Sequence, residues 1–412
     1  MAFALFLIIK KAMPLFQSVF KKYDNLNNSI QENVKGMRVV KSFVREDYEK
    51  NKFGKASEEV CADFTKAERL VALNSPAMQI AMYTAMIIVS YVGAKLIINS
   101  GGSTMGVGAL SSMFTYGMQI LSSLMMLSMI FVMITISNAS IQRICEVLNE
   151  ESTIENPENP KTSVPNGSID FNGVSFKYHA GAEKNALTDI DLHIKSGETI
   201  GIIGGTGSSK SSLIQLISRL YDATEGEVLV GGRNVKDYDI ETLRNAVSVV
   251  LQKNVLFSGT IKENLRWGDM NATDEELVRV CKLAQADEFI NTLPDGYDTH
   301  IEQGGTNVSG GQKQRLCIAR ALLKKPKIII FDDSTSAVDT KTDALIRKAL
   351  ATEIPDTTKI IIAQRISSVQ EADRIVVMED GRINAVGTHE ELLNSNDIYK
   401  EVYYSQNKAG EE

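Results

Sequence analysis

Two long stretches of the sequence contain no charged side chain, and they limit the possible folds more than any other feature. No Asp, Glu, Lys or Arg occurs in residues 70–94 or in residues 96–142. An α-helix crosses a bilayer with about 20 mostly apolar residues, and residues 76–98 and 107–134 both meet that length. A pair of buried helices in a soluble core is the alternative, but such helices rarely stay uncharged for so long. The sequence therefore predicts two membrane spans in a lipid bilayer.

The residues around these spans predict the topology. The polar segment 99–106 indicates a tight loop between the spans. Residues 1–9 are apolar but cover only about half a span, and Lys10 and Lys11 follow them, the reverse of a secretory signal. They resemble the end of a helix, and the basic segment after them is typical of the cytoplasmic side. We expect a multi-pass cell-membrane protein that is cytoplasmic after Arg143. We also expect a fragment or a late start codon, because two and a half spans make an incomplete membrane domain.

Composition argues against several other classes of protein. The chain has 412 residues, enough for two or three domains. Its net charge of −7 gives no sign of the basic surface that a nucleic-acid partner requires. Its four cysteines are far apart and lack C-x-x-C spacing, so neither a zinc site nor a disulfide framework is expected.

A second domain is predicted after a polar stretch with three prolines at residues 149–167, which is typical of a linker. Short β-branched segments then alternate with helical ones over residues 168–406, which predicts a layered α/β domain before a short tail at 407–412.

A phosphate-binding loop follows the predicted strand at residues 198–203. The motif G-x-x-x-x-G-K-[ST] is matched except for one position by Gly204, Gly205, Thr206, Gly207, Ser208, Ser209, Lys210, Ser211 and then Ser212. In such a loop backbone N–H groups bind phosphate, the lysine reaches the terminal phosphates, and the next hydroxyl, here Ser211, holds Mg²⁺. Ser209 replaces the last glycine, at a cost on the order of 1 kcal/mol if that position needs a positive φ. Taken alone, the motif is also compatible with an ordinary strand-turn-helix that binds no nucleotide.

Two further segments predict ligands of the same nucleotide. The apolar run 327–331 ends in Asp332 and Asp333, as a buried parallel strand does when it presents an acid at its carboxyl end. We expect Asp332 to be a Mg²⁺ ligand, with an exposed acidic turn as the alternative. A predicted helix begins with Ser309, Gly310, Gly311 and Gln312, whose backbone N–H groups form an anion-binding surface.

The order of these segments resembles the ABC transporter ATPases: a phosphate loop, then S-G-G-Q, then D-D-S-T-S-A-V-D at residues 332–339. The resemblance implies that Tyr178 stacks on the adenine of ATP. It also implies that Gln252 links Mg²⁺ to the membrane domain, and that Ser336, Ala337, Val338 and Asp339 face a partner subunit.

The resemblance extends to the rest of the chain. Residues 1–148 are similar to the second half of a six-helix exporter half-transporter, and residues 28–40 would include its second coupling helix. The implied fold is a partial, exporter-type α-helical transmembrane domain followed by an α/β P-loop ABC ATPase domain.

Three positions depart from the family pattern. Asp333 stands where the family has its catalytic glutamate and is one methylene shorter, and Gln364 replaces the switch histidine with a neutral amide. Ser209 is the third departure. The implied catalytic residues are thus Asp333, Gln364 and Gln252, and the implied Mg²⁺ ligands are Ser211, Gln252 and Asp332. Together the departures predict a site that binds Mg-ATP and hydrolyses it slowly.

The family sandwiches ATP head to tail between two subunits, with the phosphate loop of one facing the S-G-G-Q of the other. We therefore expect this chain to be the degenerate-site subunit of a heterodimeric exporter, with its own S-G-G-Q completing the partner's site. A homodimeric exporter, a nucleotide-responsive regulatory subunit and a soluble ABC protein of translation or DNA repair are the alternatives. Drugs, lipids and peptides all stay open as substrates.

Overall fold

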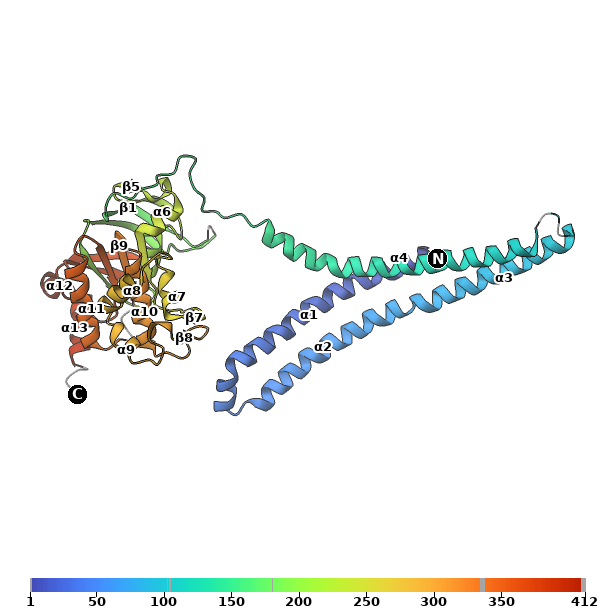
Figure 1. Ribbon diagram of the computed structural model, residues 1–412, viewed down its shortest axis with the longest axis horizontal. Helices are drawn as coiled ribbons and strands as arrows, with labels where there is room; N and C mark the ends of the chain where they lie inside the picture. Colours follow the sequence, from blue (N-terminus) through green and yellow to red (C-terminus); the bar gives the residue numbers. More distant parts are fainter. Residues whose placement is uncertain (1, 102, 104, 180, 334–337, 409–412) are drawn as a thin grey trace. The chain divides into compact units, whose positions relative to one another are not determined.

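The computed structural model describes residues 2–101, 103, 105–179, 181–333 and 338–408. The chain divides into two compact units, Met1–Glu151 and Ser152–Glu412. The first unit consists of four helices: α1 (Ala2–Ser42), α2 (Glu46–Ala72), α3 (Asn74–Ser100) and α4 (Val107–Leu148). Helix α1 packs beside α2 and α3 beside α4, in two antiparallel pairs (Figure 1).

Helices α3 and α4 contain the two predicted spans. Two helical stretches, Glu46–Ser100 and Val107–Phe131, are long and apolar enough to cross a membrane, and almost none of their residues are buried. Their large apolar side chains, such as Ile87 and Met129, point outward, the reverse of a helix in a soluble core. Helix α3 continues to Ser100 and ends at Gly101, which has a φ of 60°. The loop is therefore shorter than residues 99–106, because the left-handed conformation of the glycine terminates the helix.

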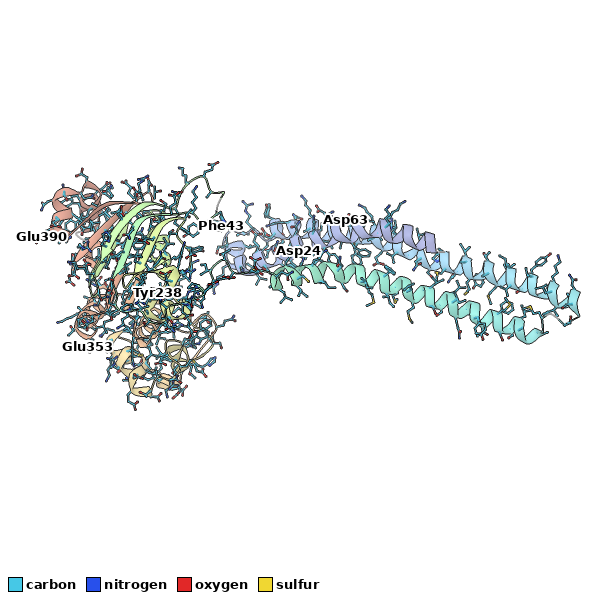
Figure 2. The ribbon with its side chains drawn as sticks, turned by 90° about the horizontal axis from the view of Figure 1, so that it is seen from above. Asp24, Phe43, Asp63, Tyr238, Glu353 and Glu390 are labelled. Atoms are coloured by element: carbon cyan, nitrogen blue, oxygen red, sulfur yellow. The ribbon has the colours of Figure 1, made fainter. Side chains whose placement is uncertain are left out.

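The segment expected to contain the coupling helix lies within α1. Helix α1 continues without a break to Ser42, and the chain reverses direction at residues 43–45. Phe43 and Val44 in this turn are largely exposed (Figure 2). Further along the helix pair, Lys22 and Asp63 join α1 to α2 through an ion pair of 2.8 Å. The end of this helix pair therefore presents apolar side chains, while charged groups hold its two helices together.

The second unit is built on two sheets. The larger has the order β12-β11-β3-β10-β9-β6, in which only the edge strand β12 pairs antiparallel. Its strands are β3 (Thr199–Gly204), β6 (Val247–Val250), β9 (Ile328–Asp332), β10 (Thr358–Ile362), β11 (Arg374–Glu379) and β12 (Arg382–Gly387). The smaller, antiparallel sheet has the order β2-β1-β4-β5, from β1 (Ile169–Phe176), β2 (Leu187–Ile194), β4 (Glu225–Val230) and β5 (Arg233–Asn234). A third, two-stranded sheet consists of the short strands β7 (Gly259–Thr260) and β8 (His300–Ile301).

Helices surround these sheets. They are α5 (Lys210–Ile217), α6 (Ile240–Ala246), α7 (Ile261–Arg266), α8 (Asp274–Leu283), α9 (Asp287–Asn291), α10 (Gly310–Leu323), α11 (Thr340–Glu353), α12 (His389–Ser395) and α13 (Asp397–Lys408). Single 3₁₀ turns occupy Val235–Asp237, Gly296–Asp298 and Ile366–Ser368. Successive strand residues such as Ile202 and Ile203 belong to different core clusters, because neighbouring side chains point to opposite faces of a sheet. Both faces of the larger sheet are therefore buried, as in other α/β domains.

Most of the expected linker is attached to the second unit. The Asn156 side chain hydrogen-bonds Asp239 and the backbone of Ile240, and the backbone of Lys161 hydrogen-bonds that of Asp237 and Asp239. The structure accordingly groups residues 152–167 with the second unit. Prolines indicated an irregular segment, but only tertiary contacts show which unit holds it.

Candidate active site: an ATP site at the carboxyl edge of the larger sheet

The phosphate loop joins strand β3 to helix α5. A Cβ atom on Gly204 would lie 2.3 Å from the Met378 carbonyl oxygen, so the backbones approach too closely there for a side chain. Gly207 has a φ of 87° and Ser209 a φ of 68°. A non-glycine residue in this left-handed region costs about 1–2 kcal/mol. Ser209 therefore has the positive φ that makes a serine conformationally costly at this position.

The amine of Lys210 lies across the loop. It donates hydrogen bonds to the carbonyl oxygens of Gly204 at 2.8 Å and Gly205 at 2.9 Å, and to the Ser208 hydroxyl at 3.2 Å. Burial lowers the pKa of Lys210, while the negative charges of Asp332 and Asp333 oppose that shift. The loop thus holds the Lys210 amine inside it. This amine adds a positive charge to the backbone groups that phosphate oxygens would contact.

Ser211 and Asp332 form the pair predicted to hold Mg²⁺. The Ser211 hydroxyl donates to Asp332 Oδ1 at 3.1 Å, although the two residues are 121 positions apart in the chain. Burial raises the pKa of Asp332, while the Ser211 hydrogen bond lowers it. No cluster of three or more His, Cys, Asp or Glu side chains that could hold a metal occurs among the described residues. One carboxylate and one hydroxyl fit Mg²⁺, which prefers oxygen ligands and completes its shell with phosphates and water.

Asp333 lies between two glutamine side chains. Its Oδ2 accepts hydrogen bonds from the amide nitrogen of Gln364 at 2.6 Å and from that of Gln252 at 3.2 Å. Strands β6, β9 and β10 are parallel neighbours, and the three residues follow their carboxyl ends. This edge of a parallel sheet is where such folds bind ligands. The phosphate loop follows the next strand, β3, so strand order brings four distant segments to one edge.

Tyr178 lies against the first turn of α5. Its hydroxyl hydrogen-bonds Ser212 Oγ at 2.8 Å and Gln215 Oε1 at 3.3 Å. The ring makes edge-on contacts with Phe176 and Tyr221, with centroids 4.8 Å and 5.2 Å apart. Tyr178 is still 44% exposed, so a fixed aromatic ring is open to a base stacked on it.

The S-G-G-Q segment begins helix α10. Ser309 caps the helix by accepting the Gln312 N–H, and the Gln312 side chain accepts the Ser309 N–H at 2.9 Å. This reciprocal capping fixes the first turn. Ser309 and Gly310 are exposed, so the N–H groups of this helix end are presented to solvent. The arrangement suits an anion supplied from outside this chain.

Comparison with known proteins now identifies the family. A model of the ABC transporter transmembrane region matches residues 1–124, and an ABC transporter model matches residues 187–336. The uncharacterized ABC transporter ATP-binding protein YfiB of Bacillus subtilis is 39% identical over 399 residues, 97% of this chain and 68% of the relative. The chain belongs to the ABC transporter family.

Two more relatives refine this assignment. A Staphylococcus aureus protein, provisionally named a multidrug export ATP-binding/permease protein, is 41% identical over 379 residues, 92% of this chain and 65% of the relative. The structure of a bacterial Atm1-family ABC exporter with ATP bound superposes with a TM-score of 0.87 at 28% identity, covering 98% of this chain and 71% of that one. The predicted fold class, an exporter-type transmembrane region followed by an ABC ATPase domain, is confirmed.

Membership in the ABC transporter family confirms the general part of the functional prediction. The chain is an exporter-like ATP-binding and permease protein, its ATPase domain is cytoplasmic, and ATP with Mg²⁺ is the expected ligand of that domain. The transmembrane match overturns the alternative of a soluble ABC protein of translation or DNA repair.

Within this ABC transporter, the predicted site residues fall into three groups. One sheet edge brings together the phosphate loop, including Thr206, with Asp332, Asp333, Gln252 and Gln364. Tyr178 lies beside α5, and residues 309–312 belong to α10. Ser336 and Ala337 lie outside the described residues, whereas Val338 is buried and Asp339 caps α11 by accepting the Thr342 N–H.

Sequence reasoning missed the contacts that hold Tyr178 in place. Tyr221 and Gln215 belong to no motif, and each contacts Tyr178 only through the fold. The helical spacing of Ser212 and Gln215, three residues apart, was the one available signal, because it places both on the same face of α5.

Proposed function

We propose that the chain is the ATP-binding and permease subunit of a heterodimeric ABC exporter whose own site binds Mg-ATP but cleaves it slowly. The observation that carries this proposal is Asp333. Its short carboxylate stands in the place of the catalytic glutamate and is held by two neutral amides, Gln252 and Gln364.

Nucleotide binding is assigned to the intact part of the site. The adenine stacks on Tyr178, and the phosphates lie on the N–H groups of residues 204–212 with the Lys210 amine beside them. Ser211, Asp332 and Gln252 would hold Mg²⁺, which would supply positive charge to the phosphates. The hydrogen bond between Ser211 and Asp332 supports this, because it already places the two oxygens within reach of one ion.

Slow cleavage follows from what surrounds the phosphates. A base must reach the attacking water, and Asp333 is one methylene shorter than glutamate. Loss of a well-placed base typically costs 10²- to 10⁴-fold in rate. Gln364 hydrogen-bonds but carries no proton, and Ser209 adds backbone strain to the loop.

The intact helix end supports a division between two subunits. Ser309, Gly310 and Gly311 present a hydroxyl and N–H groups that would meet the γ-phosphate bound by a partner, where charge develops during cleavage. A homodimer would repeat the same three departures in both sites, so a partner with an intact glutamate and histidine is the better account.

Export is the transport direction that we propose, supported by the exporter fold and by the name of the Staphylococcus aureus relative. A purely regulatory subunit would have the same weak ATP site but would not export a substrate. ATP-driven export in lipid vesicles containing this chain and its partner separates the two accounts, and absence of flux favours regulation.

The slow site is tested by reversing its three departures together. Ser209→Gly, Asp333→Glu and Gln364→His in the full chain are expected to raise Mg-ATP turnover at least tenfold, because a base regains its reach. A chain with Ser163→Gly and Asp47→Glu, which repeats two of the three chemical changes at exposed positions outside the site, is the control. An unaltered chain that turns over at rates typical of enzymes, about 1 to 10³ per second, would refute the proposal.

A further inference from the structure

The C-terminal helix α13 packs against the segment that carries Gln364. Tyr399 of α13 is fully buried and hydrogen-bonds His389 of α12 at 2.7 Å. Ile366, two residues after Gln364, is also buried and belongs to the same hydrophobic cluster as Tyr399. The position of α13 is therefore set by the domain core beside the switch segment, which we define as residues 364–366.

One side chain of α13 contacts the switch segment twice. The Gln406 amide nitrogen donates to the Gln364 carbonyl oxygen at 2.7 Å, and its oxygen accepts the Ile366 N–H at 2.9 Å. A backbone carbonyl only accepts and a backbone N–H only donates, so a single orientation of this amide satisfies both bonds. Gln406 thus bridges two backbone groups of the switch segment.

The bridge completes the support of Gln364. On one side, the N–H of the preceding residue, Ala363, donates to the Ile202 carbonyl of β3 at 3.2 Å, which ties the segment to the sheet. On the other side, Gln406 holds the carbonyl of Gln364 itself. With the backbone held at both ends, the Gln364 side chain is directed at Asp333, where its amide lies 2.6 Å from Oδ2.

We propose that Gln406 is a positioning residue for ATP cleavage, which holds the switch segment so that the side chain at position 364 faces residue 333. The inference rests on the proposed function, because it assumes that this edge of the sheet cleaves ATP. Gln406 touches neither Asp333 nor the phosphate loop in any contact described above, so its influence passes through the backbone. A small displacement of a catalytic group costs up to about 10²-fold in rate, and we expect a loss of about tenfold.

Three variants separate the bridge from the rest of α13. Gln406→Met keeps the length of the side chain and loses both hydrogen bonds. Gln406→Glu still accepts the Ile366 N–H but cannot donate to the Gln364 carbonyl. Ser405→Ala, at the exposed neighbouring position, is the matched control.

Hydrogen exchange of the full chain in lipid tests the bridge itself. Gln406→Met is expected to increase amide exchange of the peptide 364–370 at least fivefold, while Gln406→Glu and Ser405→Ala keep the Ile366 amide protected. Unchanged exchange in Gln406→Met would overturn the inference. This readout does not depend on how fast the chain cleaves ATP.

Single-turnover cleavage of Mg-ATP tests the consequence, in the unaltered chain and in the chain with Ser209→Gly, Asp333→Glu and Gln364→His. The bridge acts on the backbone, so Gln406→Met should lower the cleavage rate about tenfold in both, Gln406→Glu by less, and ATP affinity should change less than twofold. A rate within twofold of the parent would overturn the inference. If the triple variant cleaves no ATP, the proposed function fails, and the exchange result alone decides on Gln406.

Discussion

The sheet edge that carries the phosphate loop and the helix end that carries S-G-G-Q belong to the same unit, yet they differ in how closely they follow the family pattern. The sheet edge has three departures, at Ser209, Asp333 and Gln364, and two of them, Ser209 and Asp333, occupy left-handed backbone positions. The helix end is intact and fully capped, with Ser309 and Gln312 satisfying each other's backbone groups. In a head-to-tail dimer these two surfaces serve different ATP molecules.

On the proposed function, that difference separates the surface that binds ATP from the surface that acts in its cleavage. A binding surface tolerates a shorter carboxylate and a neutral amide, because stacking, phosphate contacts and Mg²⁺ ligation do not require a base. A surface that stabilises the transition state tolerates little change, because its N–H groups act only when aimed at developing charge. We therefore expect the chain to be sensitive at its helix end and tolerant at its own loop.

The sharpest test of this comparison is a pair of substitutions in the assembled dimer. Ser309→Arg should lower ATP turnover and transport about 10²- to 10³-fold, the effect of removing transition-state donors. Lys210→Ala, in contrast, should leave a substantial part of both, because on the proposed function it removes an ATP that is seldom cleaved. ATPase and flux assays in lipid vesicles measure the two, with Ser163→Arg at an exposed position as control. Equal losses would make the two sites equivalent and favour the homodimer.

Nucleotide binding by the chain itself provides the next test. Lys210→Ala should abolish measurable binding of a fluorescent ATP analogue to the purified chain, because the only cation hydrogen-bonded within the described part of the loop is removed. Titration in the presence of Mg²⁺ measures the change. An unchanged affinity would mean that the loop is not the nucleotide site.

A smaller effect is expected at the aromatic contact. Tyr178→Ala should weaken binding of the ATP analogue about tenfold, since stacking of a base on an aromatic ring contributes roughly 1–3 kcal/mol. Tyr178→Phe keeps the ring and loses only the hydrogen bonds to Ser212 and Gln215. It should bind within about threefold of the unaltered chain, and an equal loss in both variants would assign the effect to the hydroxyl rather than to stacking.

The smallest effect concerns backbone strain. Ser209→Gly should stabilise the ATPase unit by up to about 1 kcal/mol, because relief of the left-handed conformation exceeds the entropy that glycine adds to the unfolded chain. Thermal unfolding measures this. Ser163→Gly is the matched control, since Ser163 is exposed and absent from the residues with positive φ, and it should be slightly destabilising. Equal shifts would indicate that Ser209 is not strained.

Local sequence was sufficient to predict the parts of the protein that depend on local physics. Uncharged length predicted α3 and α4, because a bilayer excludes charge from any helix that crosses it. The loop before Lys210 and the acids after β9 were predicted because short motifs carry their own backbone requirements. The departures at Asp333 and Gln364 were visible only by comparison with the pattern of the ABC transporter family.

Tertiary structure decided what joins these parts. Strand order β3-β10-β9-β6 placed Gln364, Asp333 and Gln252 side by side, although Gln252 is 81 positions from Asp333. The attachment of residues 152–167 and the Gln406 bridge also left no local trace. A glutamine near the end of a helix has no distinctive periodicity or motif, so its partners are determined only when packing of the apolar face brings the helix against the core.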